Sequence, residues 1–146
     1  MCSRIDGENW YINTSDSAYF WSSATRLTAP RYPWEFMQIG NCGSPIETEA
    51  GWLLLTHGVG PVRTYAIGAV LLDRDDPLKV LSYLPEPLIT AEESEREGYV
   101  PNVVYTCGAI IHRGYLYIPY AQADKSTSMA VVKLSELLAR LKESRS

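Results

Sequence analysis

Short apolar runs separated by turn residues follow one another along most of the chain. The runs are rich in β-branched and aromatic residues and have the length of ordinary strands, so they predict a protein built almost entirely of β-strands. Residues 34–39 lead into a turn-dense loop at 40–45. The expected strands are 10–13, 18–21, 52–59, 63–72, 79–83, 102–111, 115–120 and 126–134.

The C-terminal segment departs from this pattern. Leu137, Leu138 and Leu141 recur with helical spacing, and good helix formers lie between them. This spacing predicts a short helix over 135–142. The acidic stretch 90–99 is expected to be a loop or a single helical turn.

Many short strands without a βαβ rhythm indicate an all-β sandwich, barrel or propeller, and periodicity alone does not choose among them. Two echoes, Gly-aromatic-apolar at 51–55 and again at 114–118, favour a propeller. A blade takes about 40–45 residues and a propeller closes with about 4–8 blades. We therefore predict one domain over 1–146 that forms a partial propeller of about two to three blades, followed by the short helix.

Composition excludes several classes of protein. The net charge is −4 and the sequence pI about 5.2. Without a basic cluster, nucleic acid is not an expected partner, and no stretch is apolar enough to suggest a membrane span. The three cysteines lack metal-site spacing, so we expect free thiols, no metal and a cytoplasmic protein.

Four stretches together resemble one family of carbohydrate-active enzymes. The first is QIGNCGSPIETEAGW at 38–52, which runs on to HGV at 57–59. The others are LLDRDDP at 71–77, EREGYVPNVV at 95–104 and YAQAD at 120–124. In this order and spacing they are similar to the C-terminal portion of glycoside hydrolase family 130, the mannoside phosphorylases and their hydrolase relatives.

The resemblance implies a five-bladed β-propeller that cleaves β-mannosidic bonds with inversion. Such an enzyme binds an oligosaccharide and needs no cofactor, with inorganic phosphate as the co-substrate if the reaction is phosphorolysis. The family's general acid precedes the matched region, and no counterpart is found in this chain. Gln38 stands where the phosphorylases carry Lys, so the positive charge that would favour phosphate is missing there.

Six residues are candidates for substrate or phosphate binding. His57 ends an apolar strand beside a glycine, although a histidine there can also be a core residue. Asp124 can accept hydrogen bonds from sugar hydroxyls or can cap a turn. Glu97 lies in an acidic run that is otherwise typical of a solvated loop. The full set is His57, Asp124, Glu97, Gln38, Arg63 and Asn41, and the catalytic residues stay unassigned.

Two functions from different classes remain open. In the first, the chain is a fragment or truncated form of a β-mannoside phosphorylase or hydrolase. In the second, it is an inactive sugar-binding or oligomerising module, because an incomplete propeller exposes strand edges that pair with other chains. The expected partner is a second copy of the chain, or a chain that supplies the missing blades. A third alternative is a complete small all-β domain closed into a barrel.

Overall fold

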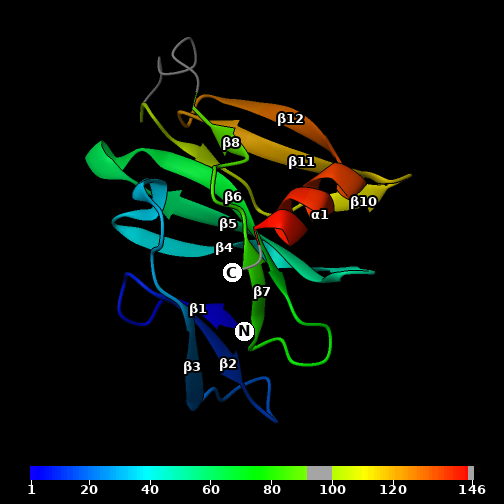
Figure 1. The fold of residues 1–146 in the computed structure, drawn as a ribbon. Coiled ribbons are helices and arrows are strands. Elements are labelled where there is room, and N and C mark those ends of the chain that lie inside the picture. Colours follow the sequence, from blue (N-terminus) through cyan, green and yellow to red (C-terminus); the bar gives the residue numbers. More distant parts are fainter. Residues whose placement is uncertain (92–99, 145–146) are drawn as a thin grey trace.

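Three antiparallel sheets stack side by side in the computed structural model, which describes residues 1–91 and 100–144 (Figure 1). The first sheet has the order β1-β2-β3 and the middle sheet the order β4-β5-β6-β7, with β8 also paired to β6. The third sheet has the order β10-β11-β12, with β9 paired to β11. The C-terminal helix α1 lies beside the third sheet (Figure 1).

The strands of the first sheet are β1 (Cys2–Ser3), β2 (Trp10–Thr14) and β3 (Ser23–Thr28). Those of the middle sheet are β4 (Gln38–Thr48), β5 (Gly51–Val59), β6 (Tyr65–Leu72), β7 (Val80–Tyr83) and β8 (Ile89–Thr90). The third sheet contains β9 (Val104–Tyr105), β10 (Ile110–His112), β11 (Tyr115–Gln122) and β12 (Ser126–Lys133). The helices are α1 (Leu134–Glu143) and two 3-10 turns, η1 (Pro33–Glu35) and η2 (Pro61–Arg63).

The middle sheet is buried on both faces, which explains the unbroken leucine run in β5. Successive side chains of a strand point to opposite faces. Leu53 and Leu55 pack toward the third sheet and α1, whereas Leu54 packs with Trp10 of the first sheet. A strand covered on both faces reads as a nearly continuous apolar run rather than an alternating one, because the side chains on both faces are buried.

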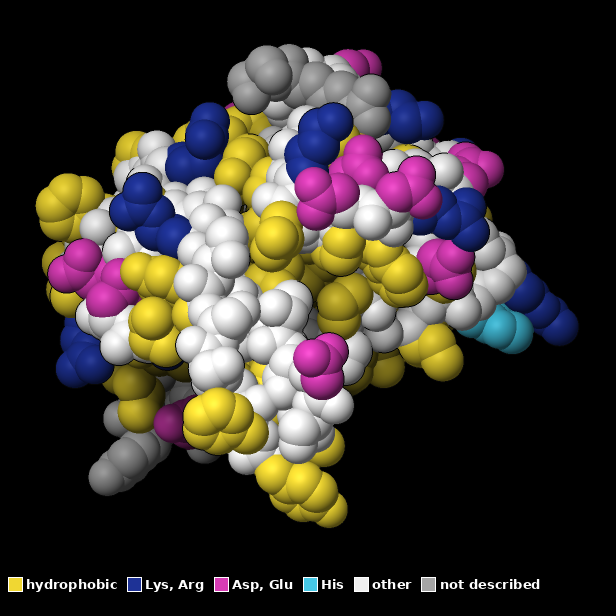
Figure 2. All heavy atoms as spheres, turned by 90° about the horizontal axis from the view of Figure 1, so that it is seen from below, with side chains coloured by type: hydrophobic (Ala, Val, Ile, Leu, Met, Phe, Trp, Pro, Cys, Tyr) yellow, Lys and Arg dark blue, Asp and Glu magenta, His cyan; other side chains and the backbone are white. Residues whose placement is uncertain are grey.

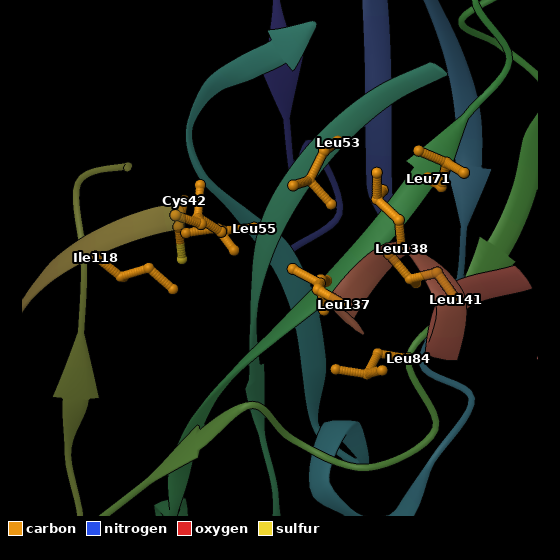
Figure 3. Close-up of a cluster of buried hydrophobic side chains, with 11 residues drawn as sticks. Cys42, Leu53, Leu55, Leu71, Leu84, Ile118, Leu137, Leu138 and Leu141 are labelled. Carbon is orange, nitrogen blue, oxygen red and sulfur yellow. The ribbon is translucent and has the colours of Figure 1, made fainter. Parts of the chain in front are cut away.

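The larger core lies between the middle sheet, the third sheet and α1 (Figure 3). The helix contributes Leu137, Leu138 and Leu141, and β11 contributes Leu116 and Ile118. All five side chains are buried. The helix therefore closes the end of this core, and its leucines point toward the strands of the middle sheet (Figure 3).

Most expected strands and the C-terminal helix are confirmed, but 18–21 is not a strand. These aromatic residues form the tip of the β2–β3 hairpin, where Trp21 Nε1 donates to the Ala18 carbonyl and the Ser17 N–H donates to Ser15 Oγ. Tyr19 is 97% exposed. The next strand is β3, and its mostly polar sequence does not show the apolar run from which strands were predicted.

The stretch 40–45 is not a loop either, because it belongs to β4. The pairing with β5 shifts register between Cys42 and Ile46, so the strand carries a bulge rather than a turn. Gly43 has φ +76, and a Cβ there would clash with the Cys107 carbonyl oxygen. The glycine lets the backbone of β4 approach the backbone at Cys107 closely.

The expected strand 102–111 is divided into β9 and β10. Between them Thr106 Oγ1 accepts the Gly108 N–H and donates to the Pro119 carbonyl. These bonds interrupt the strand pairing with β11 in the segment between β9 and β10.

The expected loop or turn at 90–99 lies mostly outside the described residues. Asp73 caps the turn after β6, since its Oδ1 accepts the N–H groups of Asp75 and Asp76.

Candidate functional site

A cavity of about 690 Å³ opens where the middle and third sheets meet. Because neighbouring strands are antiparallel, the start of β4, the end of β5 and the start of β6 lie at the same end of the middle sheet. The β11–β12 turn and the segment before β9 close the other side. The lining residues are Arg4, Gln38, His57, Val62, Arg63, Tyr65, 100–105 and Asp124.

His57 is half-buried on the face of β5 that looks toward the third sheet. It pairs with Gly40 on β4, and a Cβ at Gly40 would lie 2.7 Å from His57 Cε1 and 2.9 Å from Nε2. The ring can occupy this place only because residue 40 has no side chain. Burial lowers the pKa of His57, and the nearby Arg4 charge lowers that pKa further.

Two arginines bring positive charge to the cavity from different elements. Arg4 follows β1, and its Cδ lies 3.3 Å from the position of a Cβ on Gly40, beside the imidazole. Arg63 ends η2, between β5 and β6. Sequence reasoning found Arg63 but missed Arg4, because no run or motif distinguishes Arg4 and its position follows only from the pairing of β1 with β2.

Backbone strain is concentrated around this cavity. Six described non-glycine residues have positive φ, and four of them line it: Val62 (57°), Arg63 (54°), Asn102 (63°) and Asp124 (52°). Such conformations are costly for L-residues, most of all for β-branched ones, and they gather at functional sites. The clustering is independent of residue chemistry and supports a functional role.

Asp124 is exposed at the β11–β12 turn and lines the same cavity as Arg63. The turn is fixed to the neighbouring segment, since the Ala123 N–H donates to the Val103 carbonyl at 2.9 Å. The Tyr65 N–H in turn donates to the Asn102 carbonyl at 2.8 Å, which links this segment to β6. The backbone that carries Asp124 therefore has a defined place at the cavity.

The structure brings together four of the six residues proposed from sequence: His57, Asp124, Gln38 and Arg63 all line this cavity. Asn41 does not, because it lies on the other face of β4 and borders a separate cavity of about 500 Å³ next to the first sheet. Its Nδ2 donates to the Gly43 carbonyl at 2.9 Å. Glu97 lies outside the described residues.

The side chains of the cavity suit an anion together with a polyol. Arginine guanidinium groups bind phosphate and carboxylate oxygens through charge-assisted hydrogen bonds. A neutral imidazole and the Gln38 amide add uncharged donors, and Asp124 adds an acceptor for hydroxyls. Within residues 1–91 and 100–144, no group of three His, Cys, Asp or Glu side chains is placed to hold a metal ion.

On the face seen in Figure 2, basic and acidic side chains are interspersed and do not form the basic patch that is typical of nucleic-acid binding. No described helix is both long and apolar enough to cross a membrane. The three cysteines are free thiols.

Stacked antiparallel sheets that leave a cavity with two arginines at the strand ends are compatible with part of a β-propeller. The family model of glycoside hydrolase family 130, described as beta-1,4-mannooligosaccharide phosphorylase, matches residues 1–143, and the chain belongs to this family.

Three relatives illustrate the similarity. A 1,2-beta-oligomannan phosphorylase of Thermoanaerobacter sp. (strain X514) is 38% identical over 138 residues, covering 94% of this chain and 47% of the relative. A beta-1,4-mannooligosaccharide phosphorylase of Ruminococcus albus is 32% identical and is covered to 41%. The structure of beta-1,2-mannobiose phosphorylase from Listeria innocua, in complex with beta-1,2-mannobiose, superimposes with a TM-score of 0.87 at 31% identity, covering 97% of this chain and 41% of that one.

The chain thus spans less than half the length of these relatives. Its three sheets and short C-terminal helix form part of the family's five-bladed propeller, and the described strands do not close into a barrel. The predicted partial propeller of two to three blades is confirmed.

Proposed function

We propose that this chain is one part of an enzyme that cleaves β-mannosidic bonds, and that its cavity binds the phosphate or water nucleophile and part of the sugar. One observation carries the proposal: Arg4, Arg63, His57, Gln38 and Asp124 converge on a single cavity from five separate segments. The family relatives named above support the substrate class. Activity, substrate and partners of the whole enzyme remain part of the proposal.

The proposed chemistry divides between two parts of the propeller. In inverting cleavage an acid protonates the leaving oxygen while a nucleophile attacks the opposite face of the sugar ring. We assign this cavity to the nucleophile side, where the two arginines and the imidazole donate to phosphate oxygens and Asp124 accepts from sugar hydroxyls. The proton donor is assigned to a part of the family's fold that this chain does not cover.

A turnover assay tests the proposal. The chain is incubated with β-1,2-mannobiose, β-1,3-mannobiose and β-1,4-mannobiose, with and without inorganic phosphate, while mannose and mannose 1-phosphate are measured. Mannose 1-phosphate formed only with phosphate indicates phosphorolysis, and mannose formed without phosphate indicates hydrolysis. Where neither appears, phosphate and mannobiose binding are titrated, and absence of both turnover and binding contradicts the proposal.

Gln38→Lys is the matched variant for this assay. It places a positive charge at the start of β4, where Gln38 offers only a neutral amide, so phosphate binding is expected to tighten by about tenfold, the effect of one charge-assisted hydrogen bond. Mannobiose binding is expected to change much less. Equal effects on both ligands would show that residue 38 does not distinguish phosphate from sugar.

A second function, as an oligomerising module, is favoured by the outer face of the third sheet. On this face β10, β11 and β12 expose large apolar side chains: Ile110 (67% exposed), Met129 (57%), Val131 (53%) and Tyr115 (43%). Both faces of the middle sheet are covered by other elements, whereas only one face of the third sheet is covered. We propose that further sheets pack here, supplied by a second copy or by a chain that carries the missing blades.

Light scattering tests this assembly. We expect the purified chain to form a dimer whose fraction rises with protein concentration, because burying an exposed apolar face is favourable. Met129→Glu and Val131→Glu together are expected to shift the equilibrium to monomer. A monomer at all concentrations would exclude the second copy and leave a separate chain as the partner.

A further inference from the structure

Cys42 contacts the His57 imidazole and lies in the core between the middle and third sheets. Its side chain is 3% exposed and belongs to the core cluster between the middle and third sheets (Figure 3). Its Sγ lies 3.6 Å from His57 Nδ1, within the range of a hydrogen bond to sulfur. Gly40 and Cys42 lie two residues apart on the same face of β4, so the glycine makes room for the ring and the cysteine contacts it.

The thiol is in the form that can donate a hydrogen bond. Burial raises the pKa of Cys42 to about 12, so the sulfur carries its proton at neutral pH. The nearby Thr106 backbone lowers the pKa of Cys42, but burial outweighs this effect. A protonated thiol has one S–H to donate, and His57 Nδ1 lies within its reach.

The imidazole is in the form that can accept that hydrogen bond. Burial and the Arg4 charge lower the pKa of His57, which favours the neutral ring with one protonated and one unprotonated nitrogen. In a neutral imidazole the partner of one nitrogen decides which nitrogen keeps the proton. Cys42 is the side chain that contacts Nδ1 among the described residues.

We propose that Cys42 is a positioning residue for His57: its S–H donates to Nδ1, so that the ring proton stays on Nε2 and Nε2–H is the donor offered to the cavity. No covalent step is involved. The use of Nε2–H toward a phosphate or sugar oxygen rests on the proposed function, whereas the tautomer itself does not.

One neighbouring group opposes the neutral form of the ring. The backbone of Asn41 raises the pKa of His57, although burial and Arg4 outweigh this effect. Arg4 disfavours a charged ring without choosing between the two nitrogens. The other titratable neighbours, Tyr105 and Cys107, contact each other through Tyr105 Oη and Cys107 Sγ at 3.1 Å. Among the described side chains, Cys42 is the one within hydrogen-bonding distance of Nδ1, and we therefore expect it to select the tautomer.

Nitrogen-15 NMR of the imidazole tests the proposal without any ligand. The chain has two histidines, so the His112→Gln variant leaves His57 as the single source of imidazole signals. At a pH above the His57 pKa we expect the signal pattern of the Nε2–H tautomer. A predominant Nδ1–H tautomer would overturn the proposal.

Variants of Cys42 separate its role from that of its surroundings. Cys42→Ala removes the donor and is expected to shift the tautomer ratio by about fivefold or more toward Nδ1–H, the effect of one ordinary hydrogen bond. Cys42→Ser keeps a donor and is expected to retain the Nε2–H form, whereas Cys2→Ala makes the same deletion in the first sheet and should leave the ratio unchanged. An unchanged ratio in a folded Cys42→Ala protein would also overturn the proposal.

A phosphate titration followed by the same signals distinguishes this inference from the proposed function. Phosphate that shifts the Nε2 signal supports both. If phosphate and mannobiose leave the spectrum unchanged while the tautomer responds to Cys42→Ala, the positioning role stands and the proposed function fails.

Discussion

Ile118→Ala is expected to lower the free energy of unfolding by about 2–5 kcal/mol, the range for deleting a large aliphatic side chain from a packed core. Ile118 lies on β11 and is 0% exposed. It belongs to the cluster in which β5, β6 and α1 meet the third sheet (Figure 3). The substitution leaves a cavity at the joint between two sheets, and urea unfolding followed by tryptophan fluorescence measures the loss.

Ile110→Ala is the matched control, because it makes the same substitution on the adjacent strand β10, on the opposite face of the same sheet. Ile110 is 67% exposed. We expect a loss below about 1 kcal/mol, since little apolar area leaves the protein interior. A large loss at Ile110 that grows with protein concentration would indicate that a second copy covers this face. Equal losses at low concentration would contradict the assignment of the two faces.

Strands β5, β6 and β7 of the middle sheet could be predicted, because burial on both faces produces a nearly continuous apolar run. The run 52–59 becomes β5 almost residue for residue. The same reasoning failed at 18–21, where Tyr19 and Phe20 are apolar but exposed at a hairpin tip. Apolar composition predicts a strand only where a neighbouring sheet covers it, and that neighbour is not visible in the local sequence.

Glycine was misread for a related reason. The glycines of 40–45 suggested a loop, yet Gly40 and Gly43 lie within β4. Gly40 admits the His57 ring, and Gly43 admits the backbone of Cys107. A glycine that permits close approach has the same local sequence signal as a glycine that permits a turn, and only the tertiary contact distinguishes them.

The candidate site could be predicted in part. The family resemblance pointed to His57, Asp124 and Gln38, and Arg63 was proposed from its position on the strand after His57. All four line one cavity. Asn41 was included among the candidates because it lies in the same motif as Gln38, at 38–52. In an extended strand, however, residues an odd number apart face opposite sides, so Asn41 cannot share the face of Gln38.

Arg4→Met is expected to weaken phosphate binding by about tenfold, the effect of losing one charge-assisted hydrogen bond at an open cavity. Methionine retains much of the aliphatic length of the side chain, so packing against Gly40 is largely kept and the charge is removed. Calorimetric titration with inorganic phosphate measures the change. Arg26→Met, on the exposed strand β3, changes the net charge equally and should leave the affinity unaltered.

The same variant has a second effect that does not depend on phosphate. The Arg4 charge lowers the pKa of His57, so its removal must raise that pKa toward the ordinary value of 6.5. Since burial is the larger cause, the pKa should stay below 6.5 even in Arg4→Met. The shift between wild type and variant should shrink with added salt, because salt screens charges that are reached by solvent. An NMR titration that finds no shift would remove Arg4 from the site, whereas a shift without loss of phosphate binding would keep Arg4 beside His57 and assign the anion to Arg63 alone.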